Sequence, residues 1–486
     1  MDRASLVRSR SLPVLGPGSP HDFEPSLLAT AGAEVLRGVL LVSLDWTRPK
    51  DPRLSLGHAS LLAALHAAKR VAVEGVTAAV NEPGFRIQGF TEEILRRCRA
   101  LAVSQCDIAV GAYVWNEPYL PALLRGLRLG RFRGRIILGG PQISYSGPGL
   151  EQLYPEADCF IRGYAEATLC AVAATEAKLA LPGVHWAGEP DAALPSRVDL
   201  RAIPSPFLSG LVPVAGQRFL RWETQRGCPY RCSFCQHREP GSRLHRRGLE
   251  SDRLRQEIAL FAQSGVESIA VLDPIFNIGA HALAVLAEFR QRRFTGRLSL
   301  QCRFELVSPE FLAACQELNV CLEFGLQTIH ESEGRAIERP NDLAKVTAVI
   351  GELRRLAIPF EVSLIYGLPT QTLASFRASV EFCLRMGVPT IRAFPLMLLR
   401  GTALDRDRAR WRLVESADPI PCVIASDSFT QADWLEMAAL AQALERSEGA
   451  HPTGLTQRTR GLQVAVAGSG QLSPAWPPSS LAPPVP

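Results

Sequence analysis

The sequence predicts an α/β protein with two parallel β-sheets, one in each half of the chain. Short apolar runs alternate with helical segments along both halves, as is typical of parallel strands joined by helices. Glycines and polar residues follow the apolar runs at their carboxyl ends, where such folds bind ligands. A loop with three closely spaced cysteines, Cys228, Cys232 and Cys235, lies near the start of the second half.

The composition is that of an ordinary globular protein with two or three domains. The 486 residues are 47% hydrophobic and 21% charged, with a net charge of +5. Only four residues are lysine, and the arginines are spread along the chain, which argues against a dedicated nucleic-acid face. No apolar run approaches the roughly 20 residues that span a bilayer. The twelve cysteines do not form a secreted disulfide pattern, so we expect a cytoplasmic protein.

The first half predicts a doubly wound, Rossmann-like sheet over residues 36–181. Residues 1–35 are rich in Pro, Gly and Ser, and we expect a disordered extension there. Helical periodicity follows at 54–68 and again at 91–102, where Thr91 is the expected N-cap. Five apolar runs predict buried parallel strands at 34–44, 71–76, 107–113, 135–138 and 158–161.

The second half predicts six further strands, with a linker before them and a helical segment after them. Residues 182–213, rich in Pro and Ala, favour a linker between domains. A capped amphipathic helix at about 429–446 lies within an expected lid, 411–450, and the tail 451–486 has a disordered composition. The strands of this domain, 214–410, are expected at 218–224, 268–277, 297–305, 320–327, 360–369 and 390–396.

The three cysteines favour an iron–sulfur cluster. A Cys-x3-Cys-x2-Cys loop places three thiolates on one turn, and a [4Fe–4S] cluster held by three cysteines keeps one iron open for chemistry. Tyr230 and Phe234 are aromatic residues that can shield the cluster. The alternative is a structural zinc loop, in which His237 would have to act as the fourth ligand.

This loop resembles the signature of the radical S-adenosylmethionine (SAM) enzymes, Cys-x3-Cys-x-aromatic-Cys, with Phe234 in the aromatic position. The resemblance implies a partial (β/α)6 TIM-type barrel. It also implies that SAM binds the open iron and that the reduced cluster cleaves it to a 5′-deoxyadenosyl radical. An external electron donor of the flavodoxin or ferredoxin type would reduce the cluster.

The same resemblance implies SAM contacts at Phe234 and at four positions near strand ends. Asp273, in an Asp-Pro-x-Phe-Asn segment, would address the SAM amino group, or would simply form a turn. Arg303 would fork onto the SAM carboxylate, or pair with Glu305 on the same strand face. Gln327 would contact the ribose or the substrate. Gly367 would let the backbone approach adenine, or would serve only a strand-to-helix turn.

Residues 36–180 resemble the cobalamin-binding domain that precedes many radical SAM barrels. The similar features are Leu56-Gly-His-Ala-Ser-Leu, the Leu138-Gly-Gly-Pro loop and the segment from Arg162 to Leu169. The Asp-x-His-x-x-Gly motif that supplies a lower cobalt ligand in other cobalamin domains is absent. The alternative is a degenerate Rossmann-like domain that binds nothing. The resemblance implies cobalamin contacts at Trp115, Asn116, Gly139, Gly140, Gln142, Gly163 and Glu166.

Taken together, these resemblances imply a cobalamin-dependent radical SAM enzyme, most simply one that methylates an unactivated carbon of a small molecule or peptide. The deoxyadenosyl radical would remove a hydrogen atom, and methylcobalamin would deliver the methyl group. The alternatives are a radical cyclisation or rearrangement, a tRNA methylthiotransferase, and a non-enzymatic zinc or redox scaffold. The methylthiotransferases carry three further N-terminal cysteines, and Cys98 and Cys106 do not form that set. No further catalytic residue is assigned.

Overall fold

A computed structural model of the chain describes residues 37–48, 51–52, 54–101, 103–237 and 247–455. The expected extension 1–35 and all but the first five residues of the expected tail, 451–486, lie outside the described residues. The described residues belong to one compact unit. Within them, no helix is both long and apolar enough to cross a membrane.

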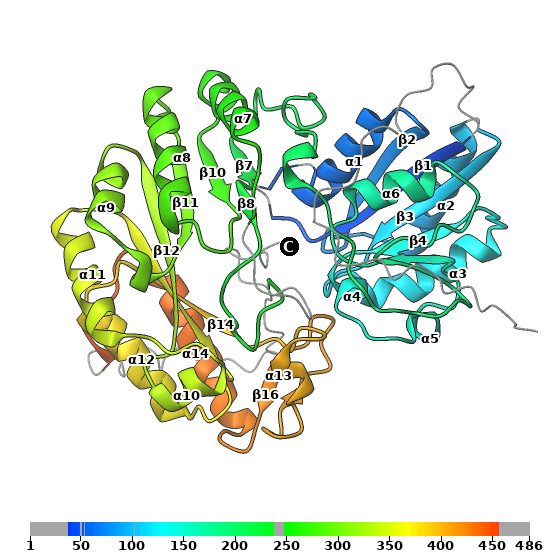
Figure 1. The fold of residues 1–486 in the computed structure, drawn as a ribbon. Coiled ribbons are helices and arrows are strands. Elements are labelled where there is room, and N and C mark those ends of the chain that lie inside the picture. Colours follow the sequence, from blue (N-terminus) through cyan, green and yellow to red (C-terminus); the bar gives the residue numbers. More distant parts are fainter. Residues whose placement is uncertain (1–36, 49–50, 53, 102, 238–246, 456–486) are drawn as a thin grey trace, which may run out of the picture. The chain divides into compact units, whose positions relative to one another are not determined.

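The first half forms the expected doubly wound sheet (Figure 1), with strand order β2-β1-β3-β4-β5-β6. The first five strands in this order are parallel, and β6 pairs with β5 in the antiparallel sense. The order changes direction between β1 and β3, and ligands of doubly wound sheets bind beside such a switch point. The strands are β1 (Arg37–Asp45), β2 (Ala72–Ala79), β3 (Gln105–Gly111), β4 (Ile136–Gly139), β5 (Cys159–Ile161) and β6 (Val184–Trp186).

Helices cover both faces of this sheet, which explains why β1 is apolar along its whole length. Leu40 and Val42 face a core shared with α2 and α3, whereas Val39 and Leu41 face one shared with α1 and α6. Successive strand residues point to opposite faces, so both faces are buried. The helical elements are α1 (Leu56–Ala68), α2 (Ile87–Ala100), η2 (Glu117–Tyr119), α3 (Leu120–Leu129), α4 (Pro141–Ser144), α5 (Leu150–Leu153), α6 (Glu166–Ala173) and η3 (Leu200–Ala202).

Two sequence-based expectations in this half differ from the structure. Thr91 does not cap α2: the helix begins at Ile87, and the Thr91 hydroxyl donates to the Ile87 carbonyl oxygen at 2.7 Å. A threonine can satisfy its hydroxyl in this way inside a helix, so its presence does not fix the start. The expected linker 182–213 is also more than a connection between the two sheets. It contributes β6, and Phe207 and Val212 are buried in the core of the second half because their apolar side chains have a sheet to cover.

The second half forms a six-stranded parallel sheet with the sequential order β14-β13-β12-β11-β10-β7. Each strand therefore lies beside the next one in the chain, as in a (β/α) barrel that has not closed. Figure 1 shows α7, α8 and α9 alongside β10 and β11. The strands of the partial barrel are β7 (Phe219–Trp222), β10 (Ser268–Val271), β11 (Arg297–Cys302), β12 (Val320–Gln327), β13 (Phe360–Tyr366) and β14 (Thr390–Pro395).

The helices of the partial barrel bury one continuous apolar core against the sheet. Its aromatic rings include the stacked pair Phe304 and Phe324, with centroids 4.2 Å apart. The helical elements are α7 (Ser251–Ser264), α8 (Gly279–Gln291), η4 (Phe304–Leu306), α9 (Pro309–Gln316), α10 (Glu331–Ala336), α11 (Leu343–Arg355), α12 (Leu373–Arg385), α13 (Ala403–Arg406) and α14 (Gln431–Arg446). Two small pairs complete the fold: β8 (Gln225–Arg226) with β9 (Arg247–Gly248), and β15 (Val414–Glu415) with β16 (Val423–Ala425).

The expected lid is an integral part of the barrel. Helix α14 starts with a reciprocal capping box between Thr430 and Asp433, and it buries Trp434 and Met437 in the barrel core. The described start of the expected disordered tail is also in contact with the barrel. The Nε2 atom of His451 accepts a hydrogen bond from the backbone N–H of Ile391 at 3.2 Å. The C-terminal segment therefore buttresses the last strand, β14.

Candidate functional site

The cysteine loop leaves the carboxyl end of β7 and is held at its centre by two other parts of the barrel. The Ser233 N–H donates to the Ile337 carbonyl oxygen at 2.9 Å, and the Ser233 carbonyl accepts from the Leu404 N–H at 2.8 Å. Ile337 follows β12 and α10, whereas Leu404 follows β14. The loop therefore lies at the carboxyl edge of the sheet, where barrels of this kind bind ligands.

Asp273 fixes the root of this loop. Its Oδ1 atom accepts hydrogen bonds from the backbone N–H groups of Thr224 at 2.7 Å and Gln225 at 3.2 Å, and its Oδ2 atom accepts from the Thr224 hydroxyl. The side chain is fully buried, and burial raises the pKa of Asp273 to about 7. These bonds join Asp273 to another segment of the chain, so they are not those of the local turn that the sequence offered as the alternative. Its role as a contact to SAM stays a prediction.

All three loop cysteines are free thiols. Two of them, Cys232 and Cys235, accept a hydrogen bond from an N–H group. Cys232 is buried, and Cys228 and Cys235 are half-buried. The Nη1 atom of Arg339 lies 3.5 Å from the Cys232 sulfur, and the His237 N–H donates to the Cys235 sulfur at 3.4 Å. Burial raises the pKa of Cys235 to about 12, and the neighbouring thiols Cys232 and Cys228 add to this shift.

The chemistry of this donor set fits an iron–sulfur cluster with three thiolate ligands. Soft thiolates on one short loop, with N–H donors to the sulfurs and a nearby arginine, are what such a cluster uses. In the part of the chain that the structure describes, no three or more His, Cys, Asp or Glu side chains are already arranged around a metal position. The four-ligand set of a zinc loop is therefore not preformed either. Burial lowers the pKa of His237 to about 4.

Arg303 connects the next strand, β11, to the cysteine loop. Its guanidinium carbon lies 3.8 Å from the ring centroid of Tyr230, a cation–π contact with the loop itself. Its Nε atom donates to Glu305 at 3.2 Å, whereas its Nη1 atom is buried without a hydrogen-bond partner among the described residues. The prediction that Arg303 and Glu305 lie on one face of a strand was wrong. Strand β11 ends at Cys302, and Glu305 lies in the 3₁₀ turn η4.

Gln327 closes β12 in a strained conformation. Its φ angle is +68°, in the left-handed region that a residue other than glycine adopts at a cost. Its Oε1 atom is buried and has no partner in the described part of the chain. A Cβ atom at Gly325 would lie 2.5 Å from the Gln327 Nε2 atom, so the small residue makes room for the amide. Strain together with an unsatisfied acceptor is typical of a binding position.

Gly367 and Phe234 have simpler surroundings. The Gly367 N–H donates to the Gln371 side chain at 2.7 Å, and its φ angle of +90° suits the turn that ends β13. A Cβ atom there would lie 3.1 Å from the Val423 carbonyl oxygen. The observed contacts of Gly367 are therefore those of a strand-to-helix turn. Phe234 packs, half-buried, against the core of the barrel. A SAM contact at either residue stays a prediction.

The polar residues expected to contact cobalamin are engaged within the protein. The Trp115 indole N–H donates to the Leu44 carbonyl at 3.0 Å. The Asn116 side-chain amide donates to Leu44 and to Gly111 and accepts from the Tyr113 N–H. These bonds tie the loop after β3 to the end of β1. The two side chains therefore build the switch point of the sheet rather than extend from it.

The other loops at this edge are shaped by glycine. The φ angle of Gly140 is +89°, and a Cβ atom there would lie 2.7 Å from the Ala112 carbonyl oxygen. At Gly139, by contrast, a Cβ atom would meet only Ile161 O at 3.6 Å. Gln142 donates to Glu117. The Gly163 N–H donates to the Ser144 hydroxyl at 2.9 Å.

Glu166 joins the first domain to the root of the cysteine loop. It accepts from Arg226 at 2.6 Å and from the Ser60 hydroxyl at 3.2 Å, and it is almost fully buried. Arg226 also pairs with Glu223 at 2.7 Å and lies over the ring of Tyr164 at 5.1 Å. Because Arg226 is two residues before Cys228, this buried ion-pair network positions the start of the cluster loop. Sequence reasoning gave Glu166 a different role.

Sequence reasoning missed two features of the site altogether. Arg339 comes from a Glu-Arg-Pro segment without a recognisable signal, and only the fold brings it to Cys232. Arg400, after β14, reaches Glu117 of the first domain at 2.6 Å, and its carbonyl accepts from the Gln236 amide at 2.9 Å. These contacts join residues that lie far apart in the sequence.

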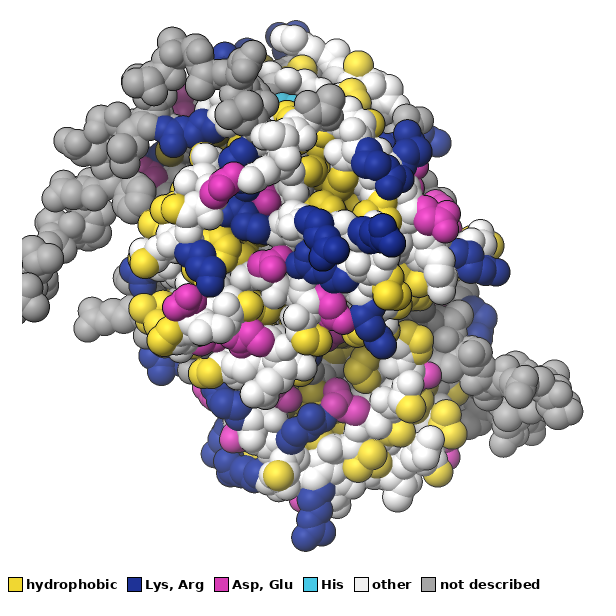
Figure 2. All heavy atoms as spheres, turned by 90° about the vertical axis from the view of Figure 1, so that its right-hand side faces the viewer, with side chains coloured by type: hydrophobic (Ala, Val, Ile, Leu, Met, Phe, Trp, Pro, Cys, Tyr) yellow, Lys and Arg dark blue, Asp and Glu magenta, His cyan; other side chains and the backbone are white. Residues whose placement is uncertain are grey.

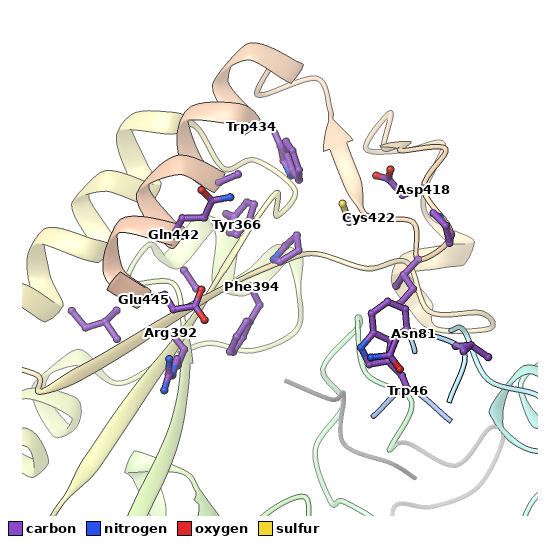
Figure 3. Close-up of a pocket in the computed structure, with 18 of the residues that line it drawn as sticks. Trp46, Asn81, Tyr366, Arg392, Phe394, Asp418, Cys422, Trp434, Gln442 and Glu445 are labelled. Carbon is purple, nitrogen blue, oxygen red and sulfur yellow. The ribbon is translucent and has the colours of Figure 1, made fainter. Parts of the chain in front are cut away.

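A cavity of about 300 Å³ lies beside β14 and α14. Figure 3 shows Tyr366, Phe394 and Trp434 among its lining residues, with Arg392, Gln442 and Glu445 nearby and Trp46 and Asn81 at its other side. Its wall thus combines strand, helix and loop residues, and five of its nineteen lining residues are aromatic. Pockets of this size and lining bind small molecules.

Comparison with known proteins identifies the barrel. The profile of the Radical SAM superfamily matches residues 222–383, which include the three cysteines and the strands up to β13. The matched segment therefore combines the cysteine signature of this superfamily with the carboxyl edge of a partial barrel.

Two curated relatives are similar to this chain over more than half of its length. The cobalamin-dependent radical SAM methyltransferase TokK of Streptomyces tokunonensis is 28% identical over 330 residues, covering 61% of this chain and 48% of TokK. A 2-(S-pantetheinyl)-carbapenam-3-carboxylate methyltransferase of Streptantibioticus cattleyicolor is 29% identical over 416 residues, covering 75% of this chain and 59% of the relative. The chain thus spans about half the length of the curated relatives that it matches.

The whole fold is similar to that of the radical SAM methyltransferase TsrM from Kitasatospora setae. A structure of TsrM with tryptophan substrate and a SAM analogue matches with a TM-score of 0.65 and 17% identity, covering 84% of this chain and 89% of TsrM. Another structure of TsrM contains cobalamin and a [4Fe–4S] cluster. Residues 222–383 thus match the radical SAM superfamily, and the fold of the chain as a whole is similar to that of TsrM.

Proposed function

We propose that this chain is a cobalamin-dependent radical SAM methyltransferase that methylates an unactivated carbon. The observation that carries the proposal is the loop of three free cysteines at the carboxyl edge of a partial barrel, preceded by a doubly wound domain. When bound, the cluster and SAM supply a radical that removes hydrogen, and cobalamin supplies the methyl group. The assignment of methyl transfer follows the printed activities of TokK and TsrM.

In this proposal, the chain's own residues bind and position the reactants. Cys228, Cys232 and Cys235 hold the cluster, leaving the open iron for SAM. The unsatisfied guanidinium nitrogen of Arg303 donates to the SAM carboxylate, and the Gln327 amide binds the ribose or the substrate. Asp273 keeps the loop root in place through Thr224, which makes it a positioning residue in this account.

Cobalamin binds, in the same proposal, at the switch point of the first sheet. Because Trp115, Asn116 and Glu166 are engaged within the protein, the contacts come from backbone and glycine surfaces of the loops after β3 and β4. The all-free cysteines suit a reducing compartment such as the cytoplasm. A flavodoxin- or ferredoxin-type protein supplies the electron.

Figure 2 shows one face of the molecule, on which Lys and Arg side chains lie among acidic and uncharged ones. Such a mixture does not favour a nucleic-acid substrate. A small molecule or a peptide is therefore the proposed substrate class.

The product mass tests the proposal against a radical cyclisation or rearrangement. Anaerobic protein with cobalamin, dithionite and SAM carrying a deuterated methyl group is incubated with carbapenam, tryptophan and peptide candidates. Methylation adds the labelled methyl group to a product and yields S-adenosylhomocysteine together with 5′-deoxyadenosine. A product of unchanged mass, formed with 5′-deoxyadenosine alone, would overturn methyl transfer and favour a rearrangement.

A further inference from the structure

The cavity beside β14 follows the edge of the strand rather than one of its faces. Five successive residues, Ile391 to Pro395, line it. Because successive strand residues point to opposite faces, all five can line one cavity only along the strand edge. In the described sheet, β14 is the outermost strand, paired with β13 alone. The cavity therefore lies where a further strand would pair.

The backbone groups on this outer edge can be identified from one hydrogen bond. The Ile391 N–H points away from β13, since it donates to His451. Residues two apart share an edge in a parallel strand, so the Ala393 N–H and carbonyl point outward as well. Pro395, the next residue of this set, has no N–H. Ala393 thus presents one donor and one acceptor toward the cavity.

The opposite wall is one face of α14. Trp434, Ala438, Ala441 and Glu445 recur every three or four residues and line the cavity together. From Trp434 to Glu445 the helix rises about 16 Å, and Ile391 to Pro395 spans about 13 Å of strand. A cavity of about 300 Å³ that follows both elements is long and narrow. It is at the small end of ligand pockets, so it suits a chain segment rather than a whole cobalamin.

Trp434 supplies a polar group that requires a partner. The side chain is 7% exposed, and its indole N–H is buried without a hydrogen-bond acceptor among the described residues. The Tyr366 ring packs beside it with centroids 5.8 Å apart, which fixes the orientation of the indole. A buried donor left unpaired costs about 1–3 kcal/mol. A ligand carbonyl in the cavity would remove this cost.

We propose that this cavity is a binding channel for the substrate tail, and that the tail is an extended chain with amide groups. An amide chain pairs with the Ala393 edge as an added strand does, and one of its carbonyls accepts from Trp434. The small side chains Ala438 and Ala441 leave room for it. The inference rests on the proposed function, because it assigns the tail to the substrate of that reaction.

The channel also has a direction. Its Pro395 end is the carboxyl edge of the barrel, and Trp46 and Asn81, beyond the carboxyl ends of β1 and β2, line the cavity there. Its Glu445 end lies toward the start of β14. The reacting part of the substrate is thus placed near the Pro395 end and the amide tail extends along β14. A short peptide and a pantetheine chain share the required chemistry.

Isothermal titration calorimetry of the anaerobic full chain without SAM tests the channel with two probes, N-acetyl-trialanine amide and pantetheine. The variants are Trp434→Phe, which keeps a ring but removes the donor, and Ala441→Leu, which fills the channel. Ala439→Leu, on the exposed face of the same helix, is the matched control. Melting curves establish that every variant is folded.

At least one probe is expected to bind the unaltered chain and Ala439→Leu equally. Binding should weaken about fivefold to tenfold in Trp434→Phe and at least tenfold in Ala441→Leu. The probe that binds identifies a peptide or a pantetheine-type tail. No binding of either probe at millimolar concentration, or equal binding by all variants, overturns the proposal. So does a loss of cobalamin affinity in Ala441→Leu, which would make the cofactor the occupant.

These results do not depend on methyl transfer. A chain that binds a probe as expected but forms no methylated product would contradict the proposed function and leave the channel intact.

Discussion

The carboxyl edges of the two sheets differ in how their polar side chains are satisfied. At the first sheet, Trp115, Asn116 and Glu166 have partners within the protein. At the barrel, Arg303 Nη1 and Gln327 Oε1 are buried without partners among the described residues. Buried polar groups are normally paired, so an unpaired group at a strand end marks where a ligand belongs.

This comparison separates residues that build a site from residues that bind. The first domain offers a ligand a surface of backbone and glycine, whereas the barrel offers directed side chains. Strain follows the same division, since Gln327, the last residue of β12, and the β-branched Thr370, which follows β13, have positive φ angles.

The largest effect is expected at the barrel edge, for Cys235→Ala. Removing one of three thiolate ligands should lower the bound iron from about four per chain to below one, because the remaining two thiolates do not retain a cubane cluster. Iron analysis after anaerobic reconstitution checks this. Cys170→Ala, which removes a half-buried free thiol of the first domain, is the control and should keep its iron. Equal iron in both variants would contradict the assignment of the loop.

Glu166→Gln should destabilise the protein by about 3 kcal/mol, because it leaves the buried Arg226 charge short of one partner. Cobalamin affinity should change less than twofold. Denaturant unfolding and a cobalamin titration measure the two effects. In the control, Glu317→Gln breaks an exposed pair with Arg290 and should cost well under 1 kcal/mol. A large loss of cobalamin affinity at unchanged stability would instead make Glu166 a ligand contact.

Arg303→Lys should weaken SAM binding about tenfold while the iron content stays unchanged. Lysine keeps the charge but loses both the fork and the stacking on Tyr230. Calorimetry with SAM on the reconstituted protein checks this, and Arg290→Lys on the surface is the matched control. If SAM affinity were equal in both variants, Arg303 would serve only its ion pair with Glu305.

The smallest effect concerns His58, a buried side chain in the first turn of α1. Burial lowers its pKa to about 4, so the folded state disfavours the charged ring. The contribution of the neutral His58 ring to the free energy of unfolding is complete above pH 6.5, about the pKa of histidine in the unfolded chain. It is lost as the pH falls toward 4, the pKa in the folded state. Between pH 7 and 5.5 the free energy of unfolding should fall by about 1 kcal/mol. Between pH 7 and 5.5 the melting temperature should fall less in His58→Leu than in the unaltered chain. An equal fall in both proteins would show that His58 does not cause this pH dependence.

The fold was predictable because local signals agree with it. The apolar runs that form β1 and β12 have the length and composition of buried strands. Because helices alternate with the strands along the chain, the sheets were expected to be parallel. The three cysteines were predictable because their ligand spacing is local in sequence.

The surroundings of the cysteines were not predictable, because they depend on tertiary contacts. Arg339 reaches Cys232 across 107 residues, and nothing in its own segment indicates a ligand. Trp115 and Asn116 occur in a loop of the kind that binds ligands, yet their side chains turn inward to Leu44. Sequence order identified the binding edges but not which side chains face out from them.

Metal analysis tests whether the chain holds both an iron–sulfur cluster and cobalamin. The protein is purified anaerobically with cobalamin supplied, and iron, cobalt and zinc are measured beside a visible spectrum. The account predicts about four irons per chain, bleached by dithionite and lost in Cys232→Ala, together with cobalt near one per chain. Iron without cobalt would reduce the first domain to a scaffold. Zinc without iron would contradict the account as a whole.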